Sequence, residues 1–141
     1  MSSDLVWLHE DALRRDHPCA DAAGEDAVCI HIWDDAYLQA SHYSLKRLVF
    51  LYETAAEAGI EMVCGDSVLT LLRHPATHIW IPSSPNPFIR TVAERLRAHK
   101  QVTEVPDHAF ARLPPGPAHR RFFAYWRQAE SSACRYDGGA A

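Results

Sequence analysis

The 141-residue sequence has no long hydrophobic run and no paired cysteine motif. No apolar stretch approaches the roughly 18 residues that a membrane-spanning helix needs, and the start, MSSDLVW, lacks the basic and apolar regions of a secretory signal. The cysteines include no Cys-x-x-Cys pair, so we interpret them as packing residues of a reducing compartment. We therefore expect a cytoplasmic protein. The cysteines are Cys19, Cys29, Cys64 and Cys134.

Excess positive charge is also missing. The net charge is -4 and the sequence pI is about 6.1, so nothing attracts the whole chain to nucleic acid or to anionic lipid. Two short basic pairs, 14–15 and 120–121, are interpreted as surface arginines, and nucleic acid is not an expected partner. A content of 48% hydrophobic and 23% charged residues is ordinary for a globular domain with a core.

Short apolar runs along the chain predict β-strands. Runs without strict alternation suit strands that are covered on both faces, as in a parallel sheet. The predicted strands span 5–8, 28–33, 60–64, 77–81 and 101–106.

The segments between these strands predict helices. From 41 to 59 the apolar residues recur at helical spacing, and Gly59 stands where a helix would end. Further helices are predicted after Asp66 or Ser67 and after Asn86, with Pro87 at the first helical position. We expect the helix within 41–59 to bury one apolar face, made of Leu45, Leu48, Val49, Tyr52, Ala55 and Ala56.

Strands that alternate with helices imply βαβ crossovers. The predicted fold is therefore α/β, a Rossmann-like three-layer sandwich with a parallel sheet of about five strands. In such sheets a ligand binds outside the carboxyl ends of the strands, near the point where strand order reverses.

The end of the chain has a different composition. A proline-rich linker is predicted at 113–118 and a helix at 119–134, within a single domain that spans 1–141. The aromatic side chains of this helix cover too wide an arc to remain in water, so we expect them to contact the domain or a partner. They are Phe122, Phe123, Tyr125 and Trp126.

The opening VWLHEDALRRDHP resembles the start of the DNA photolyase and cryptochrome family, in which a strand ending in V-W-F leads to R-R-D-L-R-x-x-D-N-P. Five residues match in one ungapped register, namely Val6, Trp7, Asp11, Asp16 and Pro18. The stretch SLKRLVFLYETAAEAGIEMVCGDSVLTLL is similar to the family's second segment, and RRFFAYWRQA is similar to the stretch that leaves its α/β domain.

This resemblance implies a photolyase-type α/β domain that stands alone. In related domains the carboxyl edge of the sheet can hold an antenna chromophore. The family's flavin adenine dinucleotide and lesion-contacting residues lie in a helical domain that would follow this sequence, so neither FAD nor photorepair is expected. His9 and Glu10 replace the family's arginine pair and His17 replaces its asparagine, so the roles of those residues do not carry over.

Two polar clusters are candidate ligand sites at the carboxyl edge. One is acidic and is able either to hold Mg²⁺ or to cap the segments that follow. The other, SSPNPFIR, combines hydroxyls, an amide and a helix start, which suits an anion or simply a capped helix. Their residues are His9, Glu10, Asp11, Asp34 and Asp35 in the first cluster, and Ser83, Ser84, Asn86 and Arg90 in the second.

The leading hypothesis is a non-catalytic protein that binds a nucleotide, flavin, folate or antenna-type chromophore at this edge. One alternative is an interaction module that forms a homodimer or recruits a partner subunit through the aromatic C-terminal helix. Another is a Mg²⁺-dependent phosphoesterase that uses the acidic cluster. No metal ligand set is assigned, because Cys29 and His31 on one strand make only half of a zinc site.

Overall fold

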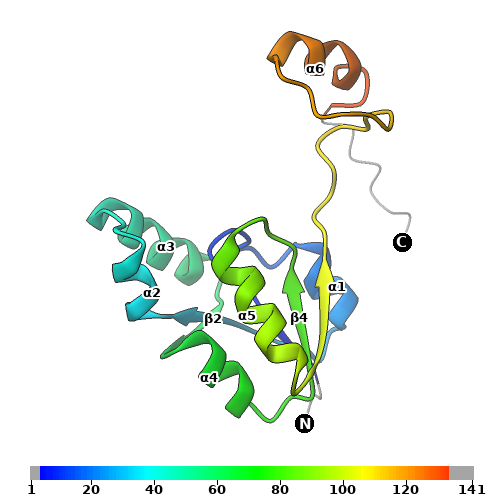
Figure 1. Ribbon diagram of the computed structural model, residues 1–141. Helices are drawn as coiled ribbons and strands as arrows, with labels where there is room; N and C mark the ends of the chain where they lie inside the picture. Colours follow the sequence, from blue (N-terminus) through cyan, green and yellow to red (C-terminus); the bar gives the residue numbers. More distant parts are fainter. Residues whose placement is uncertain (1–3, 134–141) are drawn as a thin grey trace. The chain divides into compact units, whose positions relative to one another are not determined.

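The computed structural model describes residues 4–133, which belong to two compact units (Figure 1). The first unit ends at Asp107 and the second begins at His108. None of the helices in 4–133 is long and apolar enough to cross a membrane.

The first unit is built on a five-stranded sheet with the order β3-β2-β1-β4-β5. Every pair of neighbouring strands is parallel, and Leu5 of the central strand lies beside Val28 on one side and Ile79 on the other. The predicted α/β fold with a parallel sheet is confirmed. The strands are β1 (Asp4–Trp7), β2 (Val28–Trp33), β3 (Glu61–Cys64), β4 (His78–Pro82) and β5 (Gln101–Val105).

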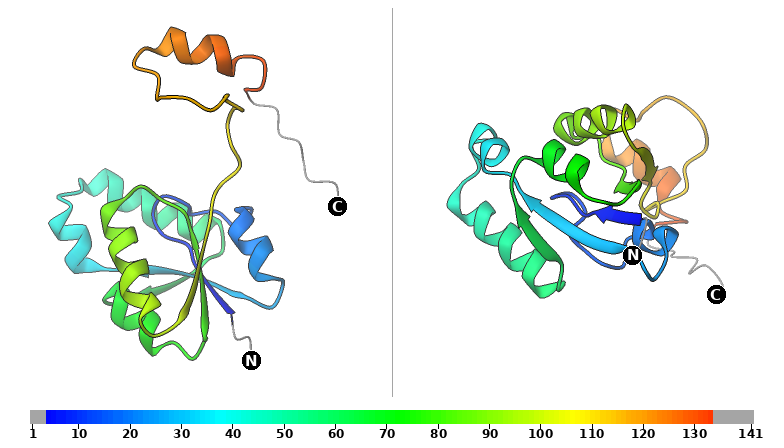
Figure 2. Two further views of the ribbon diagram at one scale, coloured as in Figure 1. Left: turned by 45° about the vertical axis from the view of Figure 1, so that its right-hand side comes forward. Right: turned by 90° about the horizontal axis from the view of Figure 1, so that it is seen from below.

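Helices cover both faces of this sheet (Figure 2). Because side chains alternate along a strand, the central strand contributes to the core on each face. Leu5 and Trp7 pack in one core with residues of α4 and α5, whereas Val6 and Leu8 pack in a second core with residues of α1 and α3. A central strand that is buried on both faces explains its continuous apolar sequence. The helices of this unit are α1 (Pro18–Ala23), α2 (Asp35–Ala40), α3 (Leu45–Glu57), α4 (Ser67–Arg73) and α5 (Pro87–Arg97).

Most helix starts follow the capping rules that the sequence indicates. The Asp66 carboxylate accepts a hydrogen bond from the Leu69 N–H, and the Asn86 side chain accepts one from the Phe88 N–H, so both predicted starts are confirmed. The short helices α1 and α2 are not predicted, since six residues are too few for a helical period to show. In addition, α1 is capped by the ring of His17, which is not a usual capping residue.

The face that α3 turns to the core differs from the prediction. Leu51 and Ala55 are buried, whereas Leu45, Val49, Tyr52 and Ala56 are exposed, so the prediction is wrong for these four. The helix carries apolar residues around more than one side, and periodicity alone cannot select the side that faces the sheet.

The second unit contains α6 (Phe122–Ala129). This helix begins later than the predicted residue 119, and its predicted end at 134 lies outside the described residues, as does Cys134. Around it the chain is irregular, and the Ser132 side chain closes a loop by accepting from the Arg112 N–H at 2.8 Å. Phe122 and Phe123 are both exposed.

Candidate functional site

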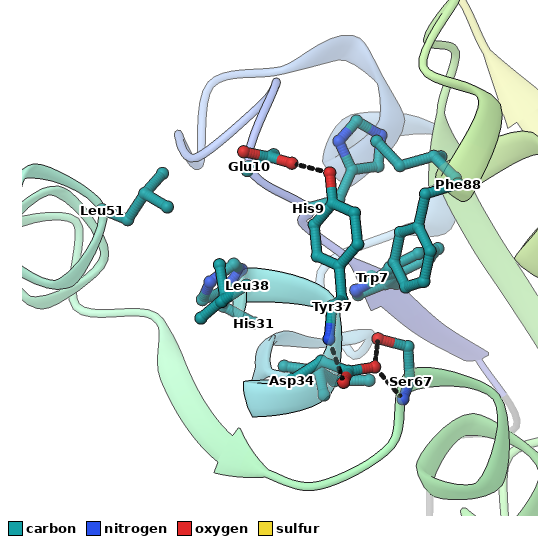
Figure 3. Close-up of a pocket in the computed structure, with 12 residues that line it drawn as sticks. Trp7, His9, Glu10, His31, Asp34, Tyr37, Leu38, Leu51, Ser67 and Phe88 are labelled. Carbon is teal, nitrogen blue, oxygen red and sulfur yellow. Dashed lines mark hydrogen bonds between the residues drawn. The ribbon is translucent and has the colours of Figure 1, made fainter. Parts of the chain in front are cut away.

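The sheet reverses its strand order between β1 and β4, since β2 and β3 lie on one side of β1 and β5 lies beyond β4. Loops that leave two such strands diverge and form a crevice at the carboxyl edge. The crevice holds a small cavity of about 20 Å³ (Figure 3). Its walls are Trp7, His9, Glu10, His31, Ile32, Asp34, Tyr37, Leu38, Leu51, Ser67, Phe88 and Ile89.

Glu10 follows β1, and its carboxylate is held inside this crevice with only 6% of the side chain exposed. The Tyr37 and Tyr43 hydroxyls donate hydrogen bonds to its Oε1 atom, the latter at 3.0 Å. The Arg47 guanidinium lies 3.5 Å from Oε2, and the Asn86 side-chain amide lies 3.4 Å from Oε1. A carboxylate removed from water requires such donors, so this charge draws four segments together.

An aromatic stack closes the crevice. The rings of Tyr37 and Phe88 lie parallel within 13°, with their centroids 3.7 Å apart. The remaining space of about 20 Å³ is enough for one water molecule and far too small for a nucleotide. A larger ligand must therefore displace some of the side chains that line the cavity.

One buried donor in the crevice has no partner within the described part of the chain. Trp7 is almost fully buried, and its indole Nε1 atom makes no hydrogen bond to any of residues 4–133. In Figure 3 this nitrogen is directed toward the centre of the cluster, in the direction of Tyr37 and Asp34. A donor that stays unsatisfied costs about 1–3 kcal/mol, so a water or a ligand acceptor in the cavity would be stabilised there.

Asp34, by contrast, is fully engaged. Its Oδ1 atom accepts from the Tyr37 N–H at 3.2 Å, and its Oδ2 atom accepts from the Ser67 N–H at 2.8 Å and from the Ser67 hydroxyl at 2.9 Å. This carboxylate caps α2 and joins it to the start of α4. The capping alternative for Asp34 is thus confirmed.

Two buried histidines connect backbone segments beside the site through hydrogen bonds. The His9 Nε2–H donates to the Pro82 carbonyl at 2.6 Å, and its Nδ1 atom accepts from the Asp11 N–H at 3.3 Å. The His31 Nδ1–H donates to the Leu8 carbonyl at 2.8 Å. Burial lowers the pKa of both rings below the ordinary value of 6.5, so both are neutral at neutral pH.

The structure gathers some of the predicted site residues and disperses others. His9, Glu10, Asp34 and Asn86 meet in or beside the crevice. Asp11 and Ser84 hydrogen-bond to each other between the loops that follow β1 and β4. Asp35, Ser83 and Arg90 do not line the cavity: Asp35 accepts from the Trp33 indole at 3.1 Å, and Ser83 and Arg90 are exposed.

Sequence reasoning missed the aromatic half of the site. Tyr37 lies on the unpredicted helix α2, and Phe88 lies in the first turn of α5, where the predicted site includes Asn86 and Arg90 but not Phe88. Trp7 lies at the end of a predicted strand, and nothing in the sequence reveals that its nitrogen lacks a partner within residues 4–133.

Residues 4–133 contain no group of three or more histidine, cysteine or acidic side chains placed to hold a metal ion. Asp34 and Asp35 are instead engaged by protein donors. No protein-family model and no curated protein matches this chain.

The first prediction concerns Asp34. Replacement by alanine removes three hydrogen bonds to a charged acceptor and leaves the buried Ser67 donors unsatisfied, so Asp34→Ala should lower the free energy of unfolding by about 3 kcal/mol. Urea denaturation measures this value. The exposed Asp26→Ala is the control and should change it by less than about 0.5 kcal/mol. Equal effects of the two substitutions would contradict this account.

The second prediction concerns pH. When pH falls through 6.5, the unfolded chain takes up protons on His9 and His31 while the folded protein does not, so the free energy of unfolding decreases. Each ring contributes at most about 1.4 kcal/mol per pH unit between its folded pKa and 6.5. Urea denaturation from pH 8 to pH 5.5 should show this decrease, and His31→Gln should reduce its slope. An identical pH dependence of the free energy of unfolding in His31→Gln would refute the claim that buried His31 contributes to it.

Proposed function

We propose that this protein binds a small planar ligand, such as a flavin or a nucleobase-containing compound, in the crevice between β1 and β4. One combination of features carries the proposal. At the point of strand reversal the crevice offers both a flat aromatic face, that of the Phe88 ring under Tyr37, and an unsatisfied donor, the Trp7 N–H. Parallel sheets of this kind bind ligands at that point.

The ring of the ligand would take the place of Tyr37. The stacked contact of Tyr37 on Phe88 marks a slot of aromatic thickness with one flat wall. When Tyr37 turns away, Glu10 and Asn86 lose a hydroxyl partner and become available to the polar edge of a ligand. A ring carbonyl or an unprotonated ring nitrogen would satisfy the Trp7 N–H.

The site is better suited to a ring than to a phosphate. The first amides of α5 are already occupied, since Phe88 N–H donates to the Asn86 side chain and Asn86 N–H donates to the Ser84 hydroxyl. The loop between β4 and α5 has no glycine that would let a phosphate approach the backbone. Any phosphate groups of the ligand would therefore extend toward solvent.

The resemblance to the photolyase and cryptochrome family also belongs to this proposal. A domain of that type with a flavin or antenna-type chromophore at the carboxyl edge is compatible with the parallel sheet and the aromatic slot. The role would be to hold the chromophore rather than to catalyse a reaction on it.

A second candidate function is partner binding through the C-terminal unit. Phe122 and Phe123 are 63% and 74% exposed, while Tyr125 and Trp126 are half-buried in the same helix. Between 108 and 133 the chain carries four arginines and one acidic residue, although the whole protein is acidic. An aromatic and basic surface of this kind suits a partner that offers apolar and acidic groups.

The third prediction tests the ligand site. Tyr37→Ala removes the ring that a ligand has to displace, so it should tighten binding of riboflavin or adenosine by about tenfold, whereas Phe88→Ala should weaken it by a similar factor. Fluorescence titration measures riboflavin binding, and equilibrium dialysis measures adenosine binding. Phe123→Ala, in the other unit, is a matched aromatic control and should leave both affinities unchanged.

Two results would overturn the proposed function. One is the absence of riboflavin and adenosine binding at about millimolar concentration in both the native protein and folded Tyr37→Ala, since that range covers even weak ligands. The other is binding that is unaffected by Phe88→Ala. Circular dichroism establishes that each variant is folded.

A further inference from the structure

Helix α3 carries a second apolar stripe that the core does not use. Its core contacts come from Leu51 and Ala55. At about 100° of rotation per residue, the second stripe lies about 110° around the helix from these contacts. Leu45 on this stripe is 75% exposed and Tyr52 is 56% exposed. The exposed stripe consists of Leu45, Val49, Tyr52 and Ala56.

The spacing of the exposed stripe is symmetric. Its members are separated by four, three and four residues, so the pattern reads the same from either end of the helix. Spacings of three and four are those of residues that pack at helix–helix seams. In an antiparallel pair of identical helices, Leu45 meets Ala56 of the second copy, and Val49 meets Tyr52 of the second copy. A two-fold axis then relates the two halves of the contact.

The charges beside the stripe fit the same arrangement. Lys46, Glu53 and Glu57 are exposed and lie along one flank of the stripe. A two-fold antiparallel pair brings this flank against the same flank of the second copy. Lys46 then lies between Glu53 and Glu57 of the second copy, displaced from each by two residues, which is about 3 Å of helix rise. A parallel pair would not bring these opposite charges together.

We propose that two copies of this protein associate through α3, as an antiparallel helix pair centred between Val49 and Tyr52. The association does not depend on the ligand site. A helix of 13 residues gives a contact about 20 Å long, which is small for a stable dimer, so we expect dissociation in the micromolar range or weaker.

The experiment uses the full chain and measures mass by sedimentation velocity at increasing concentration. The native protein should dimerise, and Val49→Glu should raise the dissociation constant by at least about tenfold. Leu69→Glu is the matched control, since Leu69 is an exposed apolar residue of α4, and it should leave the constant unchanged.

Charge exchange tests the antiparallel register. Lys46→Glu alone should weaken the dimer, and so should Glu53→Lys combined with Glu57→Lys, because each places like charges together. An equal mixture of these two proteins should form heterodimers, since opposite charges then meet across the contact. A mixture that associates no more tightly than its components alone would overturn the register.

The proposal itself fails if the native protein remains monomeric at about 500 µM, a concentration at which even weak interfaces associate. It also fails if a dimer persists in Val49→Glu and is lost in Phe123→Ser, because α6 would then be the contact.

Discussion

A buried negative charge organises the carboxyl edge of this protein. Glu10 follows the central strand, and only 6% of its side chain is exposed. A carboxylate that is so far removed from water is stable only if donors surround it. The donors come from Tyr37 on α2, Tyr43 before α3, Arg47 on α3 and Asn86 at the start of α5. Burial raises the pKa of Tyr43, as do its hydrogen bonds to Tyr37 and Glu10, so its hydroxyl remains a donor. One charge thus sets the relative positions of segments far apart in the sequence.

The same charge explains why the crevice is aromatic and nearly full. The hydrogen bond to Glu10 holds the Tyr37 hydroxyl, and the ring behind it lies flat on Phe88. The closed arrangement is imperfect, because the Trp7 nitrogen has no hydrogen-bond partner among the residues that the structure describes. A ligand that stacks on Phe88 and accepts from Trp7 gains what the closed form lacks, and it loses the Tyr37 contacts. The affinity of the ligand depends on the difference between the free energy gained from its own contacts and the free energy lost with the Tyr37 contacts.

The sequence predicts the sheet better than the site. Short apolar runs reveal the strands because both faces are covered, and Asp66 and Asn86 reveal helix starts because their side chains have a local role. Polar residues that follow strands, such as Glu10, are recoverable for the same reason. The orientation of α3 and the position of Tyr37 are not, since they depend on contacts between distant segments that no local pattern records.

A double-mutant cycle between Glu10 and Tyr37 tests the central claim most directly. The free energies of unfolding of the native protein, Glu10→Ala, Tyr37→Phe and the double variant give the coupling between the carboxylate and the hydroxyl. We predict a favourable coupling of about 1–3 kcal/mol, as expected for a buried hydrogen bond to a charged acceptor. A coupling below about 0.3 kcal/mol, within the range of independent sites, would contradict the claim that Glu10 holds the crevice closed.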